Sequence, residues 1–331
     1  MSDFIDSSAV SIPAAPLSGP LVWRGDDLDP QAGHVRVPAA VADELDRLAA
    51  LLQDNPLPAE ALEPSDFELP ACHALIARVR EALTAGPGFA LIDRLPLERW
   101  PLAVTRRLCW LFGALLARPV AQKWDGTLLY DVRDKGRPAG NGVRPDVTSI
   151  AQNFHTDNSY NHCPPHFVAL FCLQTGLSGG ESGIVSFYEA HNEMRRRHPA
   201  LLERLHRDFL FDRQREHAPD DVLTCRHPMF ACEADGSLTA RLSRRQVVNG
   251  YRLAGESLDE QGAEALEAFE AIMNEPGRAR TFQFEPGQVQ IIDNRRLGHR
   301  RDAFVDGPQE DQKRHLLRLW LRDSGRRFYN G

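Results

Sequence analysis

Basic residues are in the minority in this sequence. Its 39 Lys and Arg residues stand against 46 Asp and Glu, a formal net charge of −7 over 331 residues. A surface for nucleic acid or for an anionic membrane normally needs a clustered excess of Lys and Arg. The sequence therefore predicts no nucleic-acid partner and no membrane partner.

Long apolar runs are also missing. No stretch reaches the roughly 18 consecutive apolar residues that a transmembrane helix needs. The first 20 residues lack the basic start and apolar run of a secretory signal, so we expect a cytoplasmic protein. We expect residues 1–20 to form a flexible arm. Neither a repeat nor a linker-like segment follows, which favours a single domain over residues 21–331.

The six cysteines are scattered and form no C-x-x-C pair. That excludes a zinc knuckle and a thioredoxin-type motif, and in a reducing cytosol it favours small buried thiols over disulfides.

Apolar spacing predicts an α+β fold. Helical periodicity covers residues 41–53 and 71–83, and a buried strand, "FALI", follows the second helix. Core strands are predicted at "HFVALFCL" (166–173) and, after the turn "SGGESG" (178–183), at "IVSF". Many short strands with a few helices outside them are typical of a β-sandwich or barrel centre.

Further helices are predicted on both sides of Pro199 and after Ser257. Ser257 and Glu260 have the S-x-x-E spacing of a capping box, followed by an apolar stripe that faces the core. Strands then return at "RTFQF", "VQII" and "RHLLRLWLR". The helices over residues 41–85 and 257–273 could support a homo-oligomer, which the sequence leaves open.

The stretch "NFHTDNSY" (153–160) places His155 and Asp157 two residues apart. On a β-strand these side chains would point to the same side and could converge on one cation. His299, in "IIDNRRLGHRR", supplies a distant second imidazole. Two histidines and one carboxylate form the facial triad of non-haem Fe(II) oxygenases, which leaves coordination positions open for other ligands.

The segment "KRHLLRLWLRD" (313–323) alternates between two faces. Arg314, Arg318 and Trp320 lie on one face, and three leucines lie on the other. Such a strand could be half solvated. Beside a metal triad, an inward guanidinium would instead suit a dicarboxylate, because its planar fork meets a carboxylate bidentately.

In order and spacing, "NFHTDNSY", "CLQTGLSGGESGIVSF", "FEPGQVQIIDNRRLGHRRDAF" and "RHLLRLWL" resemble the Fe(II)/2-oxoglutarate-dependent dioxygenases of the taurine dioxygenase and γ-butyrobetaine hydroxylase family. The resemblance spans roughly residues 85–325. It implies a double-stranded β-helix (jelly-roll) core flanked by helices. It also implies hydroxylation of an unactivated C–H bond of a small amine, amino acid or organic acid, with O₂ consumed and succinate and CO₂ released.

The resemblance further implies roles for individual residues. His155, Asp157 and His299 would hold Fe(II), while Ser182 and Arg314 would bind the distal carboxylate of 2-oxoglutarate. Arg318 falls where relatives place a residue beside the substrate or the cosubstrate. Trp320 falls at an aromatic position that faces a quaternary ammonium in betaine hydroxylases, although a core aromatic explains it as well.

Two departures from the family pattern stand out. The usual Leu-His-Gly-Arg reads Gly298-His299-Arg300-Arg301 here, and the cysteine-rich zinc domain of the betaine hydroxylases is missing.

Substrate contacts are expected from the loops 122–126, 158–162 and 241–251, with these candidates: Tyr160, Arg241 and Asn249. Two alternatives remain, a zinc metallohydrolase and a non-catalytic β-barrel that binds a small anion.

Overall fold

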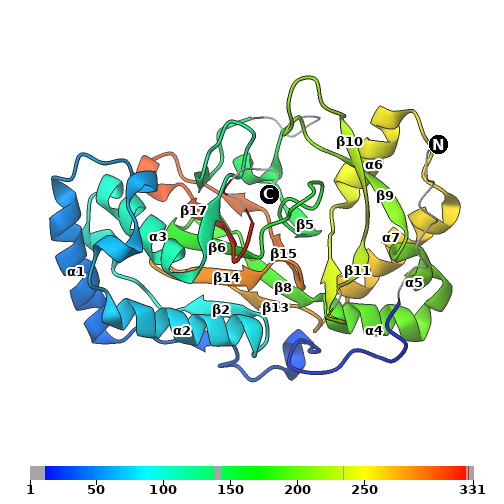
Figure 1. Ribbon diagram of the computed structural model, residues 1–331, viewed down its shortest axis with the longest axis horizontal. Coiled ribbons are helices and arrows are strands. Elements are labelled where there is room, and N and C mark those ends of the chain that lie inside the picture. The colour runs from blue at the N-terminus through cyan, green and yellow to red at the C-terminus, as the bar shows by residue number, and fades with distance from the viewer. Residues whose placement is uncertain (1–11, 138–142, 234, 326, 328–331) are drawn as a thin grey trace, which may run out of the picture.

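The apolar runs of the sequence form the strands of two sheets (Figure 1). The fold is that of a computed structural model, which describes residues 12–137, 143–233, 235–325 and 327. The larger sheet has the order β1-β2-β14-β6-β17-β3, and β4 also pairs with β17. Its strands are β1 (His34–Val35), β2 (Phe89–Ile92), β3 (Arg118–Val120), β4 (Leu129–Val132), β6 (Phe167–Gln174), β14 (Val289–Asp293) and β17 (His315–Arg322).

The smaller sheet has the order β13-β8-β15-β5, and all its pairs are antiparallel. Its strands are β5 (Gln152–His155), β8 (Ser182–Ser186), β13 (Arg280–Phe282) and β15 (Leu297–Arg301). The two sheets share one apolar core, which includes Val168, Ile292 and Trp320 from the larger sheet and Phe154 and Leu297 from the smaller.

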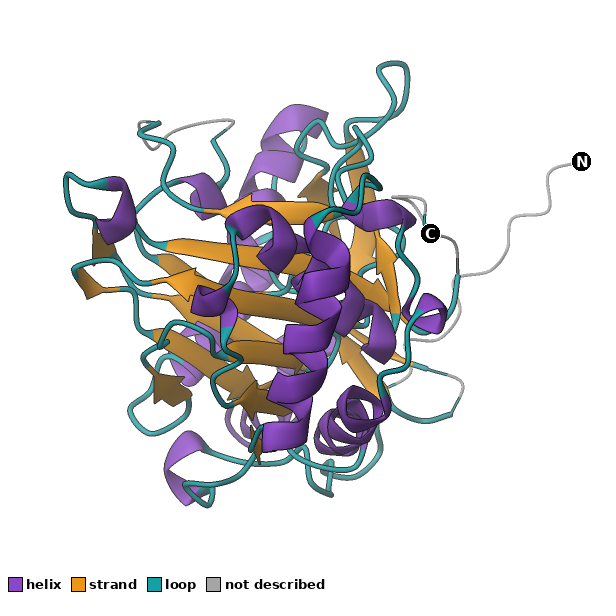
Figure 2. Cartoon of the chain, turned by 90° about the vertical axis from the view of Figure 1, so that its left-hand side faces the viewer, coloured by secondary structure: helices purple, strands orange, loops and turns teal. Residues whose placement is uncertain are grey.

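Three helices cover the outer face of the larger sheet: α1 (Ala39–Gln53), α2 (Pro70–Thr84) and α3 (Leu102–Leu116). Figure 2 shows them in front of the strands. The predicted alternation of β17 is confirmed, because Leu317, Leu319 and Leu321 belong to the core beneath these helices whereas Trp320 belongs to the core between the sheets. The arginine face is buried rather than half solvated.

The packing of this helix layer on β17 can be tested at Leu319. Its side chain is fully buried against Gly113 of α3, where an added Cβ would overlap Leu319 Cδ1. We expect Leu319→Ala to lower the free energy of unfolding by about 2–5 kcal/mol, since a cavity replaces a tightly packed side chain. Chemical denaturation measures this, with Leu177→Ala as the control because Leu177 is 61% exposed. Equal losses in both variants would contradict the packing.

The opposite end of the molecule holds the remaining helices and two hairpins (Figure 1). The helices are α4 (Phe187–Arg197), α5 (Pro199–Leu205), α6 (Arg244–Ala254) and α7 (Glu260–Met273). The hairpins are β9 (Asp208–Asp212) with β10 (Thr224–Pro228) and β11 (Phe230–Cys232) with β12 (Leu238–Ala240). The fold also contains a third two-stranded pair, β7 (Ser178–Gly179) with β16 (Phe304–Val305).

Two boundaries differ from the sequence predictions. The residue that caps α7 is Asp259, not Ser257, because its carboxylate accepts from the backbone N–H of Gly262 at 2.7 Å. The strand "IVSF" ends one residue early, at Ser186, whose hydroxyl accepts from the Glu189 N–H and caps α4. In both cases a side-chain cap decides where the helix starts. The predicted break at Pro199 is confirmed.

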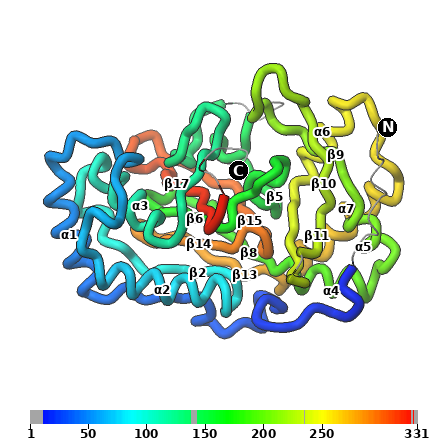
Figure 3. The backbone as a smooth tube through the Cα atoms, viewed as in Figure 1, coloured from blue at the N-terminus to red at the C-terminus, as the bar shows by residue number. Residues whose placement is uncertain are grey.

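The described part of the predicted N-terminal arm lies along α4 (Figure 3). Leu17 exchanges hydrogen bonds with the Asn192 side chain, at 2.8 Å for its N–H and 2.9 Å for its carbonyl. Residues 1–11 lie outside the described residues, so the flexibility of the arm stays a prediction. Among the helices described, none is long and apolar enough to cross a bilayer.

Candidate metal centre and active-site cavity

The three predicted metal ligands meet where the smaller sheet ends. His155 is the last residue of β5, and its register partner on β15 is His299. Asp157 lies beyond the strand, at the start of a turn. The prediction that His155 and Asp157 share the face of one strand was therefore wrong: the strand stops at His155, and the turn carries the carboxylate back toward the two rings.

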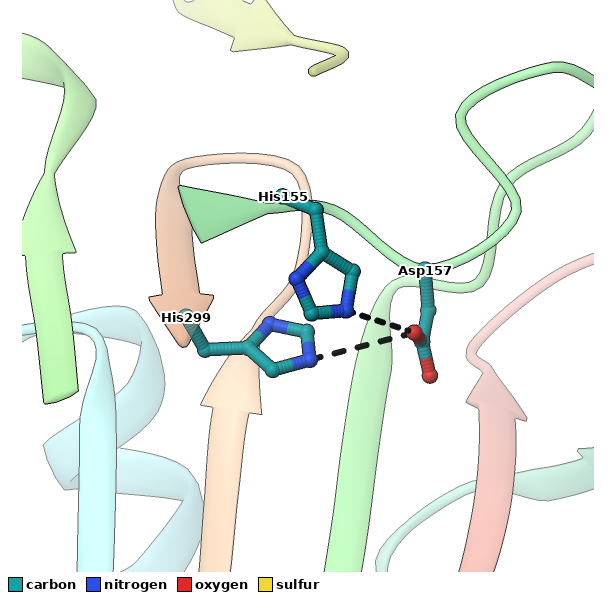
Figure 4. A group of neighbouring side chains, drawn as sticks. All are labelled: His155, Asp157 and His299. Atoms are coloured by element: carbon teal, nitrogen blue, oxygen red, sulfur yellow. Dashed lines mark ion pairs between the residues drawn. The ribbon is translucent and has the colours of Figure 1, made fainter. Parts of the chain in front are cut away.

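The ligand atoms converge on one point (Figure 4). Asp157 Oδ1 is 3.5 Å from His155 Nε2 and 3.8 Å from His299 Nε2, and the three ligand atoms all lie within 4.8 Å of one another. Bonds of about 2.0–2.2 Å to a central divalent cation fit such separations. Within the described residues, this is the one group of three or more His, Cys, Asp and Glu side chains with such an arrangement.

The His155 imidazole is held in the tautomer that a metal ligand requires. His155 Nδ1 lies 2.9 Å from the Asn153 carbonyl oxygen, so Nδ1 carries the proton and Nε2 keeps its lone pair. The Gln152 amide nitrogen lies 2.8 Å from that Nε2 and would have to turn away from a bound cation. Burial, together with the His155 ring, lowers the pKa of His299 to about 3.

The two oxygens of Asp157 have different surroundings. Oδ2 accepts a hydrogen bond from Trp320 Nε1 at 2.7 Å and lies 3.2 Å from Arg318 Nη1. Burial by itself would raise the pKa of this carboxyl, but Arg318 and the histidines outweigh it and hold the pKa well below its ordinary value. Oδ1 therefore faces the histidines as an ionised oxygen ligand.

Asn294 fixes the backbone of Asp157, a role that the sequence motifs did not predict. Its Oδ1 accepts from the Asp157 N–H at 2.8 Å, and its Nδ2 donates to the Asp157 carbonyl at 3.0 Å and to the Pro165 carbonyl at 3.3 Å. The side chain is fully buried. A polar residue directly after the apolar strand "VQIID" was the signal available in the sequence.

We expect Asn294→Ala to weaken divalent-metal binding about 10- to 100-fold, the usual effect of losing a group that orients a ligand. Calorimetric titration with metal measures this. Asn192→Ala is the matched control, because Asn192 makes a similar pair of hydrogen bonds to the backbone of Leu17 away from the triad. Unchanged affinity in the Asn294 variant would show that the turn needs no such support.

Arg318 is fully engaged beside the triad. Besides Asp157, it donates from Nε to Gln122 Oε1 at 2.7 Å and from Nη2 to Asp146 Oδ2 at 3.1 Å. Its guanidinium also lies 4.9 Å from the centre of the Tyr130 ring. These contacts place Arg318 where it can orient Asp157.

A second basic cluster surrounds Phe304. Its ring centre is 5.3 Å from the guanidinium of Arg314 and 4.7 Å from that of Arg301, and Arg301 pairs with Ser182 across β8 and β15. Burial, with the neighbouring Arg301, lowers the pKa of Arg314 to about 10, so it stays charged at neutral pH. Among the described residues neither guanidinium has a carboxylate within 4.0 Å, and Arg314 Nη1 is buried without a hydrogen-bond partner. Arg300 points elsewhere, over the Phe154 ring.

A cavity of 560 Å³ opens beside the triad. Of the predicted substrate residues, Tyr160, Asn249 and Trp320 line it, together with His155 and Asp157. Ser182 and Arg314 are not in its wall.

Arg241 does not line this cavity. It donates to the carbonyl oxygens of Asn161 and, at 3.2 Å, His162, and so supports the turn after Asp157. The loop predicted at 241–251 is also wrong, because Arg244–Ala254 is helix α6. Residues 122–126 do not line the cavity either.

Comparison with known proteins finds similarity to oxygenases in sequence and in fold. Residues 53–320 match the family model described as "Taurine catabolism dioxygenase TauD, TfdA family". FR-33289 synthase of Streptomyces rubellomurinus is 28% identical over 326 residues, which cover 96% of this chain and 94% of the relative.

Two solved structures have the same fold. An asparagine oxygenase in complex with Fe(II), 2S,3S-3-hydroxyasparagine and succinate has a TM-score of 0.64 at 18% identity, covering 88% of this chain and 94% of that one. The non-heme iron oxygenase OrfP, in complex with Fe, succinate and (3S)-hydroxy-L-Arg, has a TM-score of 0.64 at 15% identity with the same coverage.

Proposed function

Because the chain belongs to the taurine catabolism dioxygenase family TauD/TfdA, we propose that it hydroxylates an unactivated C–H bond of a small amine, amino acid or organic acid. The family predicted from the sequence motifs is thereby confirmed, and the protein is an Fe(II)- and 2-oxoglutarate-dependent dioxygenase. The convergence of His155, Asp157 and His299 beside a cavity is the observation that carries the proposal.

The triad fits Fe(II). Two imidazoles and one carboxylate are the donor set of the facial triad, and one carboxylate oxygen already accepts from Trp320 and Arg318. When bound, iron and 2-oxoglutarate supply the oxidising chemistry, with succinate and CO₂ as products. The protein fixes the ligands, and the cavity beside them holds the C–H bond in position.

Ser182 and Arg314 are proposed to bind the distal carboxylate of 2-oxoglutarate, with Arg301 as a second positive charge nearby. Support comes from the lack of an anionic partner for either buried guanidinium among the described residues, since a buried charge is normally paired. Arg318 is proposed to orient Asp157 instead of binding the cosubstrate. Tyr160, Asn249 and Trp320 are the proposed substrate contacts.

The two facing sheets are proposed to form a double-stranded β-helix within a single domain. The antiparallel pairing throughout β13-β8-β15-β5 and the core shared with the larger sheet support this assignment.

A zinc metallohydrolase could use the same three ligands. It would give no role to the buried Arg301 and Arg314, so the oxygenase is favoured.

The test is turnover. Fe(II)-loaded protein is incubated with 2-oxoglutarate, O₂ and a panel of small amines, amino acids and organic acids, and succinate is measured together with the mass of each substrate. A panel member that gains one oxygen atom in step with succinate supports the proposal. Hydrolysis products without consumption of 2-oxoglutarate would support the metallohydrolase.

A further inference from the structure

A second cavity, of 370 Å³, lies beside the turn that carries Asp157. Residues 157–160 of this turn line the active-site cavity, whereas residues 162–164 line the second one. The described walls of the two cavities have no residue in common, and the second wall includes neither Ser182 nor Arg314. The second cavity is therefore separate from the proposed sites for metal, cosubstrate and substrate.

Positive charge dominates the wall of this second cavity. Three arginines line it, Arg241, Arg295 and Arg322, and Glu233 is the one carboxylate among its described wall residues. Glu233 forms an ion pair with Arg295. The described partners of Arg241 are backbone carbonyl oxygens instead of a carboxylate. The cavity thus holds more guanidinium groups than carboxylates.

Arg241 keeps donors for a ligand. Its Nη1 donates to the carbonyl oxygens of Asn161 and, at 3.4 Å, Ser159, and its Nη2 donates to that of His162 at 3.2 Å. A guanidinium has five N–H groups, so these described hydrogen bonds leave Nε–H and one N–H of Nη2 for another acceptor. The residue is half-buried and lies in the cavity wall, so a solute in the cavity can reach it.

The charge of Arg241 lies in an unfavourable environment. Burial, with the neighbouring Arg295, lowers the pKa of Arg241 to about 10, and Glu233 opposes this less strongly than Arg295 contributes to it. Arg241 is still charged at neutral pH. Burial and then Arg241 lower the pKa of His227, another wall residue, to about 3. An anion in the cavity would offset this excess of positive charge, because a partly buried charge is stabilised by an opposite charge nearby.

The ion pair with Glu233 leaves Arg295 available to such an anion. The side chains of Arg295 and Glu233 are 32% and 42% exposed, and water screens an ion pair at that exposure strongly. Arg241 follows β12 and Arg295 precedes β15, so two distant segments of the chain bring their guanidiniums to one cavity. Support of the turn explains Arg241 alone, but it does not explain the second guanidinium.

We propose that this cavity binds a small oxyanion, a phosphate or a carboxylate group, through Arg241 and Arg295. Nε and Nη2 form one edge of a guanidinium, and that edge meets two oxygens of such a group bidentately. Arg295 lies in the same wall and supplies a second charge. The neutral ring of His227 can add an N–H donor. This site is independent of the oxygenase chemistry proposed for the triad.

The experiment uses the full chain without added metal, in chloride buffers of matched ionic strength. The probes are inorganic phosphate and acetate, and calorimetric titration measures their binding. We expect at least one probe to bind the wild type and Arg314→Ala alike, because Arg314 belongs to the proposed cosubstrate site and does not line this cavity. Tighter binding of phosphate assigns the site to a phosphate group, and tighter binding of acetate assigns it to a carboxylate group.

Arg241→Lys and Arg295→Ala should each weaken binding of the preferred probe about 10- to 100-fold, as for loss of a charged hydrogen bond. Arg226→Ala is the matched control and should bind as the wild type does. Arg226 belongs to β10, which also supplies His227 to the cavity wall, but it pairs with Glu256 at the surface at 2.8 Å.

Arg295→Ala leaves the contacts of Arg241 with the turn in place, so it decides the matter even if Arg241→Lys does not fold. Binding of neither probe to the wild type overturns the inference. So does loss of binding in Arg314→Ala, which would place the anion at the cosubstrate site. Full affinity in Arg295→Ala, or in a folded Arg241→Lys, overturns it as well.

Discussion

The Asp157→Asn protein is expected to bind Fe(II) at least about 100-fold more weakly than the wild type. This loss is larger than the one expected for Asn294→Ala, because Asn294 only orients a ligand. Trp320 Nε1 and Arg318 both donate to Oδ2, so the asparagine must direct its carbonyl oxygen toward them. Its NH₂ group then faces His155 and His299, and an amide NH₂ cannot ligate a cation. Anaerobic calorimetric titration with Fe(II) measures the loss.

Asp302→Asn serves as the control for this variant. Asp302 directly follows β15, but its side chain is half exposed and its carboxylate lies 3.9 Å from Arg300 rather than in the triad. Its affinity for Fe(II) should equal that of the wild type. The isosteric change at Asp157 should keep the fold. Affinity within a few-fold of wild type for Asp157→Asn would remove Asp157 from the ligand set.

Arg314→Ala is expected to weaken 2-oxoglutarate binding by about 2–5 kcal/mol, which is a factor of roughly 30 to several thousand. The reason is that a buried guanidinium without a carboxylate partner would bind the distal carboxylate of the cosubstrate. Iron affinity should not change, because Arg314 contacts none of the three metal ligands among the described hydrogen bonds and ion pairs. Titration of the iron-loaded protein with 2-oxoglutarate measures the effect.

The unfolding free energy of the protein without 2-oxoglutarate distinguishes a cosubstrate-binding role of Arg314 from a structural one. Removing a buried charge that has no counter-ion should leave the unfolding free energy of the apoprotein unchanged or higher, whereas a structural arginine would lower it. Arg300→Ala is the matched control, because Arg300 directly follows His299 on β15 but packs over the Phe154 ring, away from Phe304. It should bind 2-oxoglutarate as the wild type does. Normal 2-oxoglutarate affinity in Arg314→Ala would contradict the proposed site.

Much of the scaffold followed from periodicity. The strand β17 alternates with a period of two, and its leucine face could be assigned to the core because strand side chains alternate strictly. The break at Pro199 followed from the missing N–H of proline. The convergence of His155 and Asp157 was also predicted, although the local geometry was wrong. They converge through a turn that Asn294 and Arg241 hold, and those long-range contacts leave no local pattern.

Helix α6 shows why the cavity wall was harder to predict. The sequence "RLSRRQVVNGY" contains Asn249 and Gly250, which are typical of a loop. Here Gly250 serves close packing instead, since an added Cβ would lie 2.5 Å from the Leu210 carbonyl oxygen of β9. The ion pair of Asp146 likewise joins residues far apart in the chain, because its partner is Arg318. Only the tertiary structure brings these charges together.

The most direct test of the account is the anaerobic titration of Fe(II)-loaded protein with 2-oxoglutarate, followed by visible absorption, for the wild type and His299→Ala. The account predicts a charge-transfer band that saturates with 2-oxoglutarate in the wild type and is lost in the variant, because the cosubstrate must chelate an iron that the triad holds. Iron that binds to the wild type without producing the band, or an equal band in His299→Ala, would contradict it.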